Sequence, residues 1–388
     1  KNKKKRMTLP DTSSEVHRLA GVWTRLWEED PLGSGVFDRD TFVQWTQSPC
    51  GIYVDLRLPP DAPGRSLESA TAAGYTPNPV GLSTSAAATL VTIDEGDVDS
   101  SRKEQHRHVM LSQKSFAGRL TMAWGATTIG IDDTDDTDGS KSFETLQKVD
   151  PQLSILSQSQ DSAIPLCTCY WKRHIDYRPP TGGLDVGICV STNKMEDDGS
   201  VEIRETGDDG SYAEGWYRLP GTAKGPFMAL ELSTDQGVPR KGYWVRSGNR
   251  FAYAIGRPDT EEGCSTLNCE PGSSLISSQI GASLEDAISD GNDSNVDPLH
   301  QVMSYVAVVG TIQDDGSWLI ESSSRPDLVG CTLLDGNPGP LTCSILRHQE
   351  EVQNETYVSQ VSQNTGENSK WQRIWKVWEI EGFELPMN

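Results

Sequence analysis

The 388-residue chain lacks features that would place it in several large classes of protein. It has no run of about 18 or more apolar residues, so we expect no membrane-spanning helix. Lys and Arg number only 34 against 56 Asp and Glu. The resulting formal charge of −22 argues against nucleic acid as a partner. The basic cluster at residues 1–6 is more typical of a solvated arm than of a localisation signal.

Cysteine is too scarce for a disulfide scaffold, with eight in the whole chain. We therefore expect reduced thiols and favour a reducing compartment, such as the cytoplasm or an organelle stroma, over secretion. Cys264 and Cys269 lie close together in a loop-like stretch, and a bridge between them stays an open alternative.

The common catalytic signatures are also missing. The chain contains no G-x-S-x-G nucleophile elbow, no H-E-x-x-H zinc motif and no phosphate-binding loop. The sequence thus predicts no cofactor, no metal site and no assignable catalytic residue, and it favours a protein that is not an enzyme.

Short β-branched and aromatic runs, separated by Gly, Pro, Asn and Asp, make up most of the remaining chain. Such a pattern is typical of an all-β protein built as barrels or sandwiches. One short helix is expected near Val16 and Leu19. The stretches 83–106, 131–164 and 278–298 have too little apolar content for a packed core, and we expect them to be flexible insertions.

An internal sequence repeat, called the echo below, divides the chain into two similar parts. Trp and Tyr residues recur in the same order at an offset near 200 residues, which suits two related domains better than a solenoid. We predict a first β-barrel over residues 8–200 and a second over residues 201–388, the latter with a Trp-rich C-terminal segment. The matched residues are Trp23 with Trp216, Trp45 with Trp244, and Tyr53 with Tyr253.

Two predicted strands carry polar residues on one face. In GIYVDLRLP, residues 51–59, the period of two places Tyr53, Asp55 and Arg57 opposite an apolar core face. In CYWKRHIDYRPP, residues 169–180, the same alternation places His174 and Asp176 on one face.

His174 and Asp176 could act as a base and its partner, could line a barrel lumen, or could face solvent. No substrate-binding or acid group accompanies them, so catalysis is the least favoured of the three. The candidates for lining a ligand site are Tyr53, Asp55, Arg57, Trp171, His174 and Asp176.

Tryptophan has two further expected roles. Trp23 and Trp216 are interpreted as core plugs, with an Arg stacked over the indole at a closed barrel end. Near the C-terminus, Trp371, Trp375 and Trp378 either pack on the second barrel or anchor a partner or a second copy of the chain.

The order of LAGVWTRL, VQWTQSPCGIYVDLRLP and CYWKRHIDYRPPTGGLDVG resembles a family of uncharacterised bacterial two-domain lipocalin-like proteins. More distantly it is similar to a yeast casein-kinase-interacting protein with two linked β-barrels. The resemblance implies two calycin-like antiparallel barrels related by a pseudo-two-fold axis, and it implies no catalytic residue. The long acidic insertions and the C-terminal extension depart from that family.

We therefore predict a non-catalytic binding or assembly protein that engages a protein partner or itself. The alternative is a carrier of a small ligand in a barrel lumen. An enzyme that uses His174 and Asp176 is the third and least favoured hypothesis.

Overall fold

The computed structural model describes residues 16–78, 113–124, 150, 152, 155–156, 164–177, 185–235, 240–256, 305–334, 342–352, 355–362 and 372–381. Several predictions concern residues outside these ranges. They are the insertions at 83–106 and 278–298, nearly all of 131–164, the pair Cys264 and Cys269, and Trp371.

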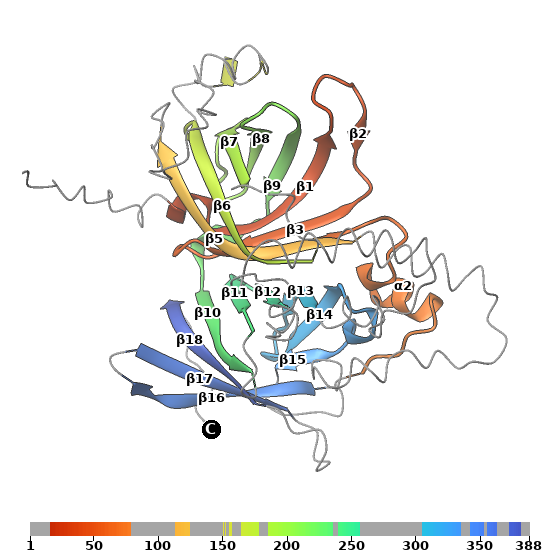
Figure 1. The fold of residues 1–388 in the computed structure, drawn as a ribbon, viewed down its shortest axis with the longest axis vertical. Coiled ribbons are helices and arrows are strands. Elements are labelled where there is room, and N and C mark those ends of the chain that lie inside the picture. Colours follow the sequence, from red (N-terminus) through yellow and green to blue (C-terminus); the bar gives the residue numbers. More distant parts are fainter. Residues whose placement is uncertain are drawn as a thin grey trace, which may run out of the picture.

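The first barrel is an antiparallel sheet in the order β2-β1-β3-β4-β5-β6-β7-β8-β9 (Figure 1). Because β9 also pairs with β1, eight of these strands form a closed ring, while β2 pairs only with the end of β1. The strands are β1 (Gly21–Glu29), β2 (Phe37–Asp38), β3 (Phe42–Gln47), β4 (Ile52–Leu58), β5 (Lys114–Trp124), β6 (Cys167–Asp176), β7 (Asp185–Ser191), β8 (Val201–Gly207) and β9 (Ala213–Arg218).

The second barrel closes in the order β10 to β18, with β18 pairing back onto β10. Its strand pairs are antiparallel except β15 and β16, which run parallel. The strands are β10 (Phe227–Asp235), β11 (Gly242–Ser247), β12 (Arg250–Ile255), β13 (Val306–Ile312), β14 (Trp318–Ser323), β15 (Thr332–Leu334), β16 (Thr342–Val352), β17 (Glu355–Ser362) and β18 (Gln372–Glu381).

Helical structure is scarce in the described residues, and the predicted all-β class is confirmed. The short helix expected near Val16 is a 3-10 turn that leads into β1. Among the described helices, none combines the length and the hydropathy needed to cross a bilayer. The helical segments are η1 (His17–Leu19), η2 (Pro63–Arg65), α2 (Leu67–Ala72), η5 (Thr222–Lys224) and η6 (Pro326–Leu328).

Strand β4 is buried on both faces, but the two faces have different surroundings, and its residues alternate accordingly. Ile52, Val54, Leu56 and Leu58 join an apolar cluster that also takes residues from β11, β12 and β13 of the other barrel, Tyr243 among them. The predicted apolar face of this strand is therefore core, but the core lies between the two barrels rather than inside one. Figure 1 shows the first barrel stacked on the second along this contact.

The change from the first sheet to the second lies between Arg218 at the end of β9 and Phe227 at the start of β10. The boundary at residue 200 predicted from the sequence falls before β8, although β8 and β9 are needed to close the first barrel. The strand pairing therefore corrects that boundary to the linker after Arg218.

The internal echo is partly corrected as well. Trp216 lies on β9, opposite Arg25 of β1 in the same barrel, so its match to Trp23 relates two neighbouring strands and not two domains. In the later part of the echo, Trp45 and Trp244 each lie on the first strand of an antiparallel hairpin, β3–β4 and β11–β12, and the relation between the two hairpins stays a prediction.

The interior of the second barrel is packed with aromatic side chains. Trp244, Trp318 and Trp375 are buried in one cluster, and the ring of Trp244 lies 5.5 Å from that of Trp318 and 5.7 Å from that of Trp375. In the same barrel, the buried Arg373 pairs with Asp235 and donates to the hydroxyl of Tyr253 at 2.9 Å. The first barrel also contains a buried aromatic cluster, in which the ring of Trp45 lies 5.7 Å from those of Trp23 and Trp216.

Candidate functional site

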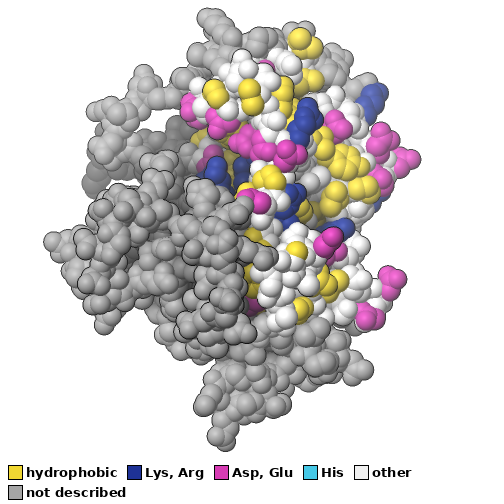
Figure 2. All heavy atoms as spheres, turned by 90° about the vertical axis from the view of Figure 1, so that its right-hand side faces the viewer, with side chains coloured by type: hydrophobic (Ala, Val, Ile, Leu, Met, Phe, Trp, Pro, Cys, Tyr) yellow, Lys and Arg dark blue, Asp and Glu magenta, His cyan; other side chains and the backbone are white. Residues whose placement is uncertain are grey.

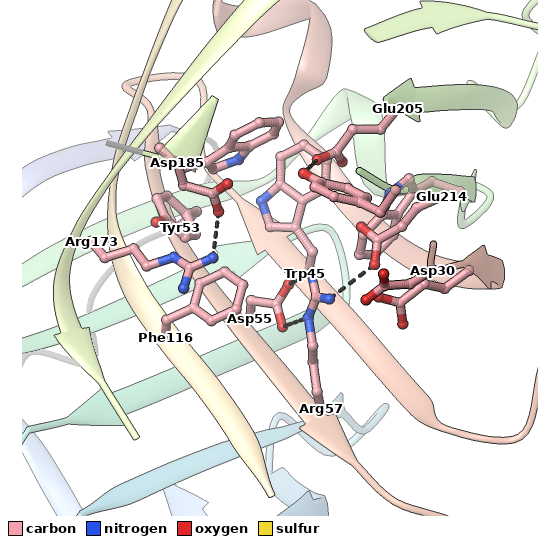
Figure 3. Close-up of a pocket in the computed structure, with 14 residues that line it drawn as sticks. Asp30, Trp45, Tyr53, Asp55, Arg57, Phe116, Arg173, Asp185, Glu205 and Glu214 are labelled. Atoms are coloured by element: carbon pink, nitrogen blue, oxygen red, sulfur yellow. Dashed lines mark hydrogen bonds and ion pairs between the residues drawn. The ribbon is translucent and has the colours of Figure 1, made fainter. Parts of the chain in front are cut away.

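A cavity of about 120 Å³ lies in the lumen of the first barrel. All eight strands of the closed ring contribute side chains to its wall, so closure of the barrel is what forms it. Its carboxyl groups are those of Glu28, Asp30, Asp55, Asp185, Glu205 and Glu214. The remaining lining residues are Trp45, Tyr53, Arg57, Phe116, Trp171, Arg173, Tyr212 and Trp216 (Figure 3).

Strand β4 supplies three of these residues through its period of two. Tyr53, Asp55 and Arg57 line the cavity, while the alternate residues of the strand pack between the barrels. The sequence placed these three residues on one face, and the structure places them together in the lumen. Trp171 of β6, a fourth candidate, lies in the same wall.

Ion pairs connect side chains from different strands in the cavity wall. Arg57 donates to Asp55 on its own strand at 3.1 Å and to Glu214 of β9 at 2.9 Å, as the dashed lines in Figure 3 show. Burial alone would lower the pKa of Arg57, but the two carboxylates hold it well above its usual value. Arg25 reaches the same Glu214 from β1 at 3.1 Å. Together these contacts tie β1, β4 and β9 to each other across the lumen.

Glu205 of β8 has a weaker partner than the other buried carboxyl groups. It accepts a hydrogen bond from the hydroxyl of Tyr212 at 3.0 Å. Burial, followed by the charges of Glu214 and Asp185, raises its pKa well above the ordinary value, which favours the protonated form. Burial also raises the pKa of Asp55, although Arg57 opposes that shift.

Four lining residues carry buried polar atoms without a hydrogen-bond partner in the described part of the chain. These atoms are Nε1 of Trp45, Nε1 of Trp216, the hydroxyl of Tyr53 and Nε of Arg173. Buried polar groups in native proteins are nearly always paired, and an unpaired one costs about 1–3 kcal/mol. Such a concentration in one cavity wall is a property expected of a binding site.

The cavity reaches solvent at one end of the barrel. Asp30 is exposed there, and the side chains of Glu28 and Asp185 are 21% and 26% exposed. Figure 2 shows acidic and basic side chains lying beside one another over the described surface of the first barrel. A small molecule could therefore enter between charged groups at the rim.

The other end of the barrel is closed by Trp23, as predicted. The indole is fully buried and donates to the carbonyl oxygen of Leu19 at 2.8 Å. The guanidinium of Arg218, on the last strand of the same barrel, lies 5.1 Å from its ring centre and donates to the carbonyl of Ala20. The expected arrangement of a plug with an Arg stacked on it is confirmed.

A register shift in β6 separates the two residues of the proposed dyad. Opposite Ala117 and Gly118 of β5, the pairing jumps from Ile175 to Arg173. The uninterrupted alternation predicted for this strand is therefore wrong beyond Arg173, because Trp171 faces the lumen while Ile175 packs between the barrels.

His174 consequently lies at the junction of the barrels, where its Nδ1 is hydrogen-bonded to the hydroxyl of Tyr243. Asp176 instead accepts from Arg173 at 3.3 Å. Neither His174 nor Asp176 belongs to the cavity wall described above. Burial, and then the charges of Lys241 and Lys172, lowers the pKa of His174 to about 4.

The C-terminal tryptophans belong to the closing strand β18. Trp375 is completely buried in the second barrel and donates to Gln360 at 3.0 Å. Trp378 is 39% exposed, donates to Glu231 at 2.7 Å, and lies 3.8 Å from the guanidinium of Arg119 in the first barrel. Of these two, only Trp378 presents surface to a partner.

Sequence reasoning missed several residues of the cavity. The sequence predicted no polar face for the strands that carry Glu205, Glu214 and Asp185. In VEIRETG, however, Val201, Ile203 and Glu205 occupy alternate positions and so share one face. Trp45 was interpreted only through the echo, and Trp216 was interpreted as a core plug, although both line the cavity. The alternation alone could have indicated an inward Glu205, but not which carboxylates lie beside it.

Within the described ranges, no group of three or more His, Cys, Asp or Glu residues is arranged to hold a metal ion. Five cysteines of the described residues, among them Cys167 and Cys189, are free thiols.

Comparison with known proteins assigns the chain to no family. No family model matches the chain, and no curated protein matches it. Among solved structures, an uncharacterised protein from Saccharomyces cerevisiae, YLR301w, is similar over 93% of this chain and 98% of its own, with 10% identity and a TM-score of 0.37. We draw no functional argument from a likeness this distant.

Proposed function

We propose that the chain is a non-catalytic binding protein that holds a small polar ligand in the lumen of its first barrel. One observation carries the proposal: the cavity wall contains four buried polar atoms that lack partners within the described residues. A ligand that supplied hydrogen bonds to them would recover free energy that the empty protein loses.

The surrounding wall supports the same proposal. The ion pairs of Arg57 with Asp55 and Glu214 fix the charged side chains before a ligand arrives, which limits the ordering cost of binding. Concave sites with aromatic walls and a few fixed polar groups are the usual form of small-molecule sites. In the described residues of the second barrel, the cluster of three indoles includes one unpaired indole N–H, that of Trp244, against the four unpaired polar atoms in the cavity wall of the first.

A thermal-shift screen of small polar metabolites, followed by native mass spectrometry, tests the proposal. We expect at least one compound to raise the Tm of the wild-type protein and to appear as a bound mass. The effect should vanish in Asp185→Trp, which places an indole at the cavity rim. It should persist in Thr121→Trp, whose exposed position lies on the outside of the same barrel. Equal binding by both variants, or no binding by the wild type, would overturn the proposal.

Assembly through a protein partner or a second copy, which the sequence favoured, stays a prediction. The same holds for the resemblance to the bacterial lipocalin-like family and to the kinase-interacting yeast protein, and for a reducing compartment. For the assembly hypothesis, one candidate residue is unsuitable: Trp375 is buried inside its own barrel, so an aromatic anchor on β18 would have to use Trp378.

A further inference from the structure

We infer that the ligand of the first barrel is a small organic ammonium compound that also carries oxygen acceptors, such as an amino sugar or a cyclic amino alcohol. The inference rests on the proposed function, because it names the chemical class that the same cavity takes. Two independent properties of the wall lead to it: an excess of carboxyl groups and a set of unpaired donors.

The charge of the wall favours a cation. Six carboxyl groups line the cavity against two guanidiniums, those of Arg57 and Arg173, and Arg25 adds a third positive charge from behind. The interactions of these charges are strong in a partly buried site, because the effective dielectric constant there is well below that of water. An anionic ligand would meet net repulsion, whereas an ammonium group would reduce the crowding of like charges.

Glu205 marks the place for the ammonium group. Each guanidinium in the wall is already paired with other carboxylates, while Glu205 is held by the hydroxyl of Tyr212. Burial, and after it the like charges of Glu214 and Asp185, raises the pKa of Glu205. A bound ammonium would reverse this shift, so binding should release the proton from Glu205.

An aromatic ring lies beside that carboxyl group. A Cβ built on Gly187 would meet the ring of Trp171 at 2.9 Å and a carboxyl oxygen of Glu205 at 3.0 Å. The ring and the carboxyl group thus pack closely against the same glycine, where a larger side chain would collide with both, and this places them beside each other in the wall. A cation placed between a carboxylate and an indole gains from both the ion pair and the cation–π interaction.

The unpaired donors require oxygen acceptors on the ligand. The indole N–H groups of Trp45 and Trp216 can only donate, and the Tyr53 hydroxyl is also without a partner. An ammonium group, itself a donor, can donate to the Tyr53 hydroxyl but cannot accept from the two indole N–H groups. Hydroxyl or ring oxygens can, and they add no negative charge to an acidic wall. The cavity of about 120 Å³ is slightly smaller than the roughly 150 Å³ that holds a benzene ring in a protein core, so it takes one ring of five or six atoms whose substituents extend towards the open rim at Asp30.

Isothermal titration calorimetry with three probes of similar ring size tests the inference. Glucosamine carries both the ammonium group and the hydroxyls, glucose lacks the charge, and cyclohexylamine lacks the oxygens. We expect glucosamine to bind at least about tenfold more tightly than either of the others, a difference equal to about 1.4 kcal/mol. Titration in buffers of different ionisation enthalpy should show proton release with glucosamine and none with glucose.

The variant Glu205→Gln separates the role of the charge from that of the fold. It should weaken glucosamine about tenfold, abolish the proton release and leave glucose unaffected. Glu202→Gln, on the same strand but outside the cavity wall, should behave like the wild type. Far-UV circular dichroism establishes that both variants are folded.

The three probes test the ammonium group, the oxygen acceptors and the proposed function separately. Glucose binding as tightly as glucosamine would overturn the ammonium inference and leave the proposed function standing. Cyclohexylamine binding as tightly would overturn the requirement for oxygen acceptors. A protein that binds none of the three, nor any compound of the metabolite screen, would overturn both the inference and the proposed function.

Discussion

Replacing Tyr53 by Phe removes one buried hydroxyl and leaves the aromatic ring in place. Tyr53 is 0% exposed, and its hydroxyl has no hydrogen-bond partner among the described residues. A buried unpaired polar group costs about 1–3 kcal/mol. We therefore expect Tyr53→Phe to raise the free energy of unfolding of the empty protein by about 1 kcal/mol. For a barrel of this size that corresponds to a rise in Tm of about 2–4 °C.

Tyr253 provides the matched control. It occupies the corresponding strand of the second barrel and is equally buried, but its hydroxyl accepts from Arg373 at 2.9 Å and donates to Gln360 at 3.3 Å. Hydrogen bonds to charged groups contribute about 1.5–3 kcal/mol, and their loss leaves a buried charge less well paired. Tyr253→Phe should consequently lower the free energy of unfolding by about 2 kcal/mol.

Urea unfolding followed by tryptophan fluorescence, together with thermal scans, compares the two variants with the wild type. Opposite signs of the two changes are the expected result. A loss of stability in Tyr53→Phe as large as that in Tyr253→Phe would show that the Tyr53 hydroxyl is paired in the native protein. That outcome would refute the reasoning on which the binding site is based.

Two further predictions concern the junction of the barrels and the closing strand. The pKa of His174 is lowered from 6.5 to about 4, so its contribution to stability is present above pH 6.5 and is lost as pH falls towards 4. The profile of Tm against pH should thus be flatter for His174→Gln over this window, and parallel profiles would contradict the assignment. Trp375→Ala should cost about 3–5 kcal/mol, because it empties a packed core. Trp378→Ala, at a half-exposed site, should cost on the order of 1 kcal/mol; equal losses in urea unfolding would contradict the distinction drawn between them.

The local pattern of the chain was sufficient to predict the class of fold. Alternation in GIYVDLRLP separated the polar face of β4, with Tyr53, Asp55 and Arg57, from its apolar face. The plug formed by Trp23 was also predictable, because a buried indole needs an acceptor for its N–H and an Arg can stack on its ring. The alternation of β4 depends only on neighbours along one strand, whereas the Arg that stacks on Trp23 comes from β9.

The face of the polar strand β6 was not predictable in the same way. An alternation with a period of two predicts the face of each side chain only while the register of the strand is unbroken. One shift opposite Gly118 moves every following side chain to the other face. Gly118 is a marker of this shift only in hindsight, since a Cβ there would lie 2.0 Å from the carbonyl oxygen of Lys172. His174 lies on the face opposite the lumen-facing Trp171 and Arg173, and the shift after it separates Asp176 from that face.

The sequence by itself determined that the chain forms short antiparallel strands with excess negative charge and alternating polar faces. Only the tertiary structure decided which polar faces meet. Glu205 and Glu214 face each other on the consecutive strands β8 and β9, but Asp55 comes from β4, far earlier in the chain, and it meets them because β9 closes the ring on β1. Barrel closure is set by pairings between distant strands, and no local pattern of residues encodes the identity of a distant partner. The acidic, aromatic cavity is therefore a property of the closed barrel rather than of any segment within it.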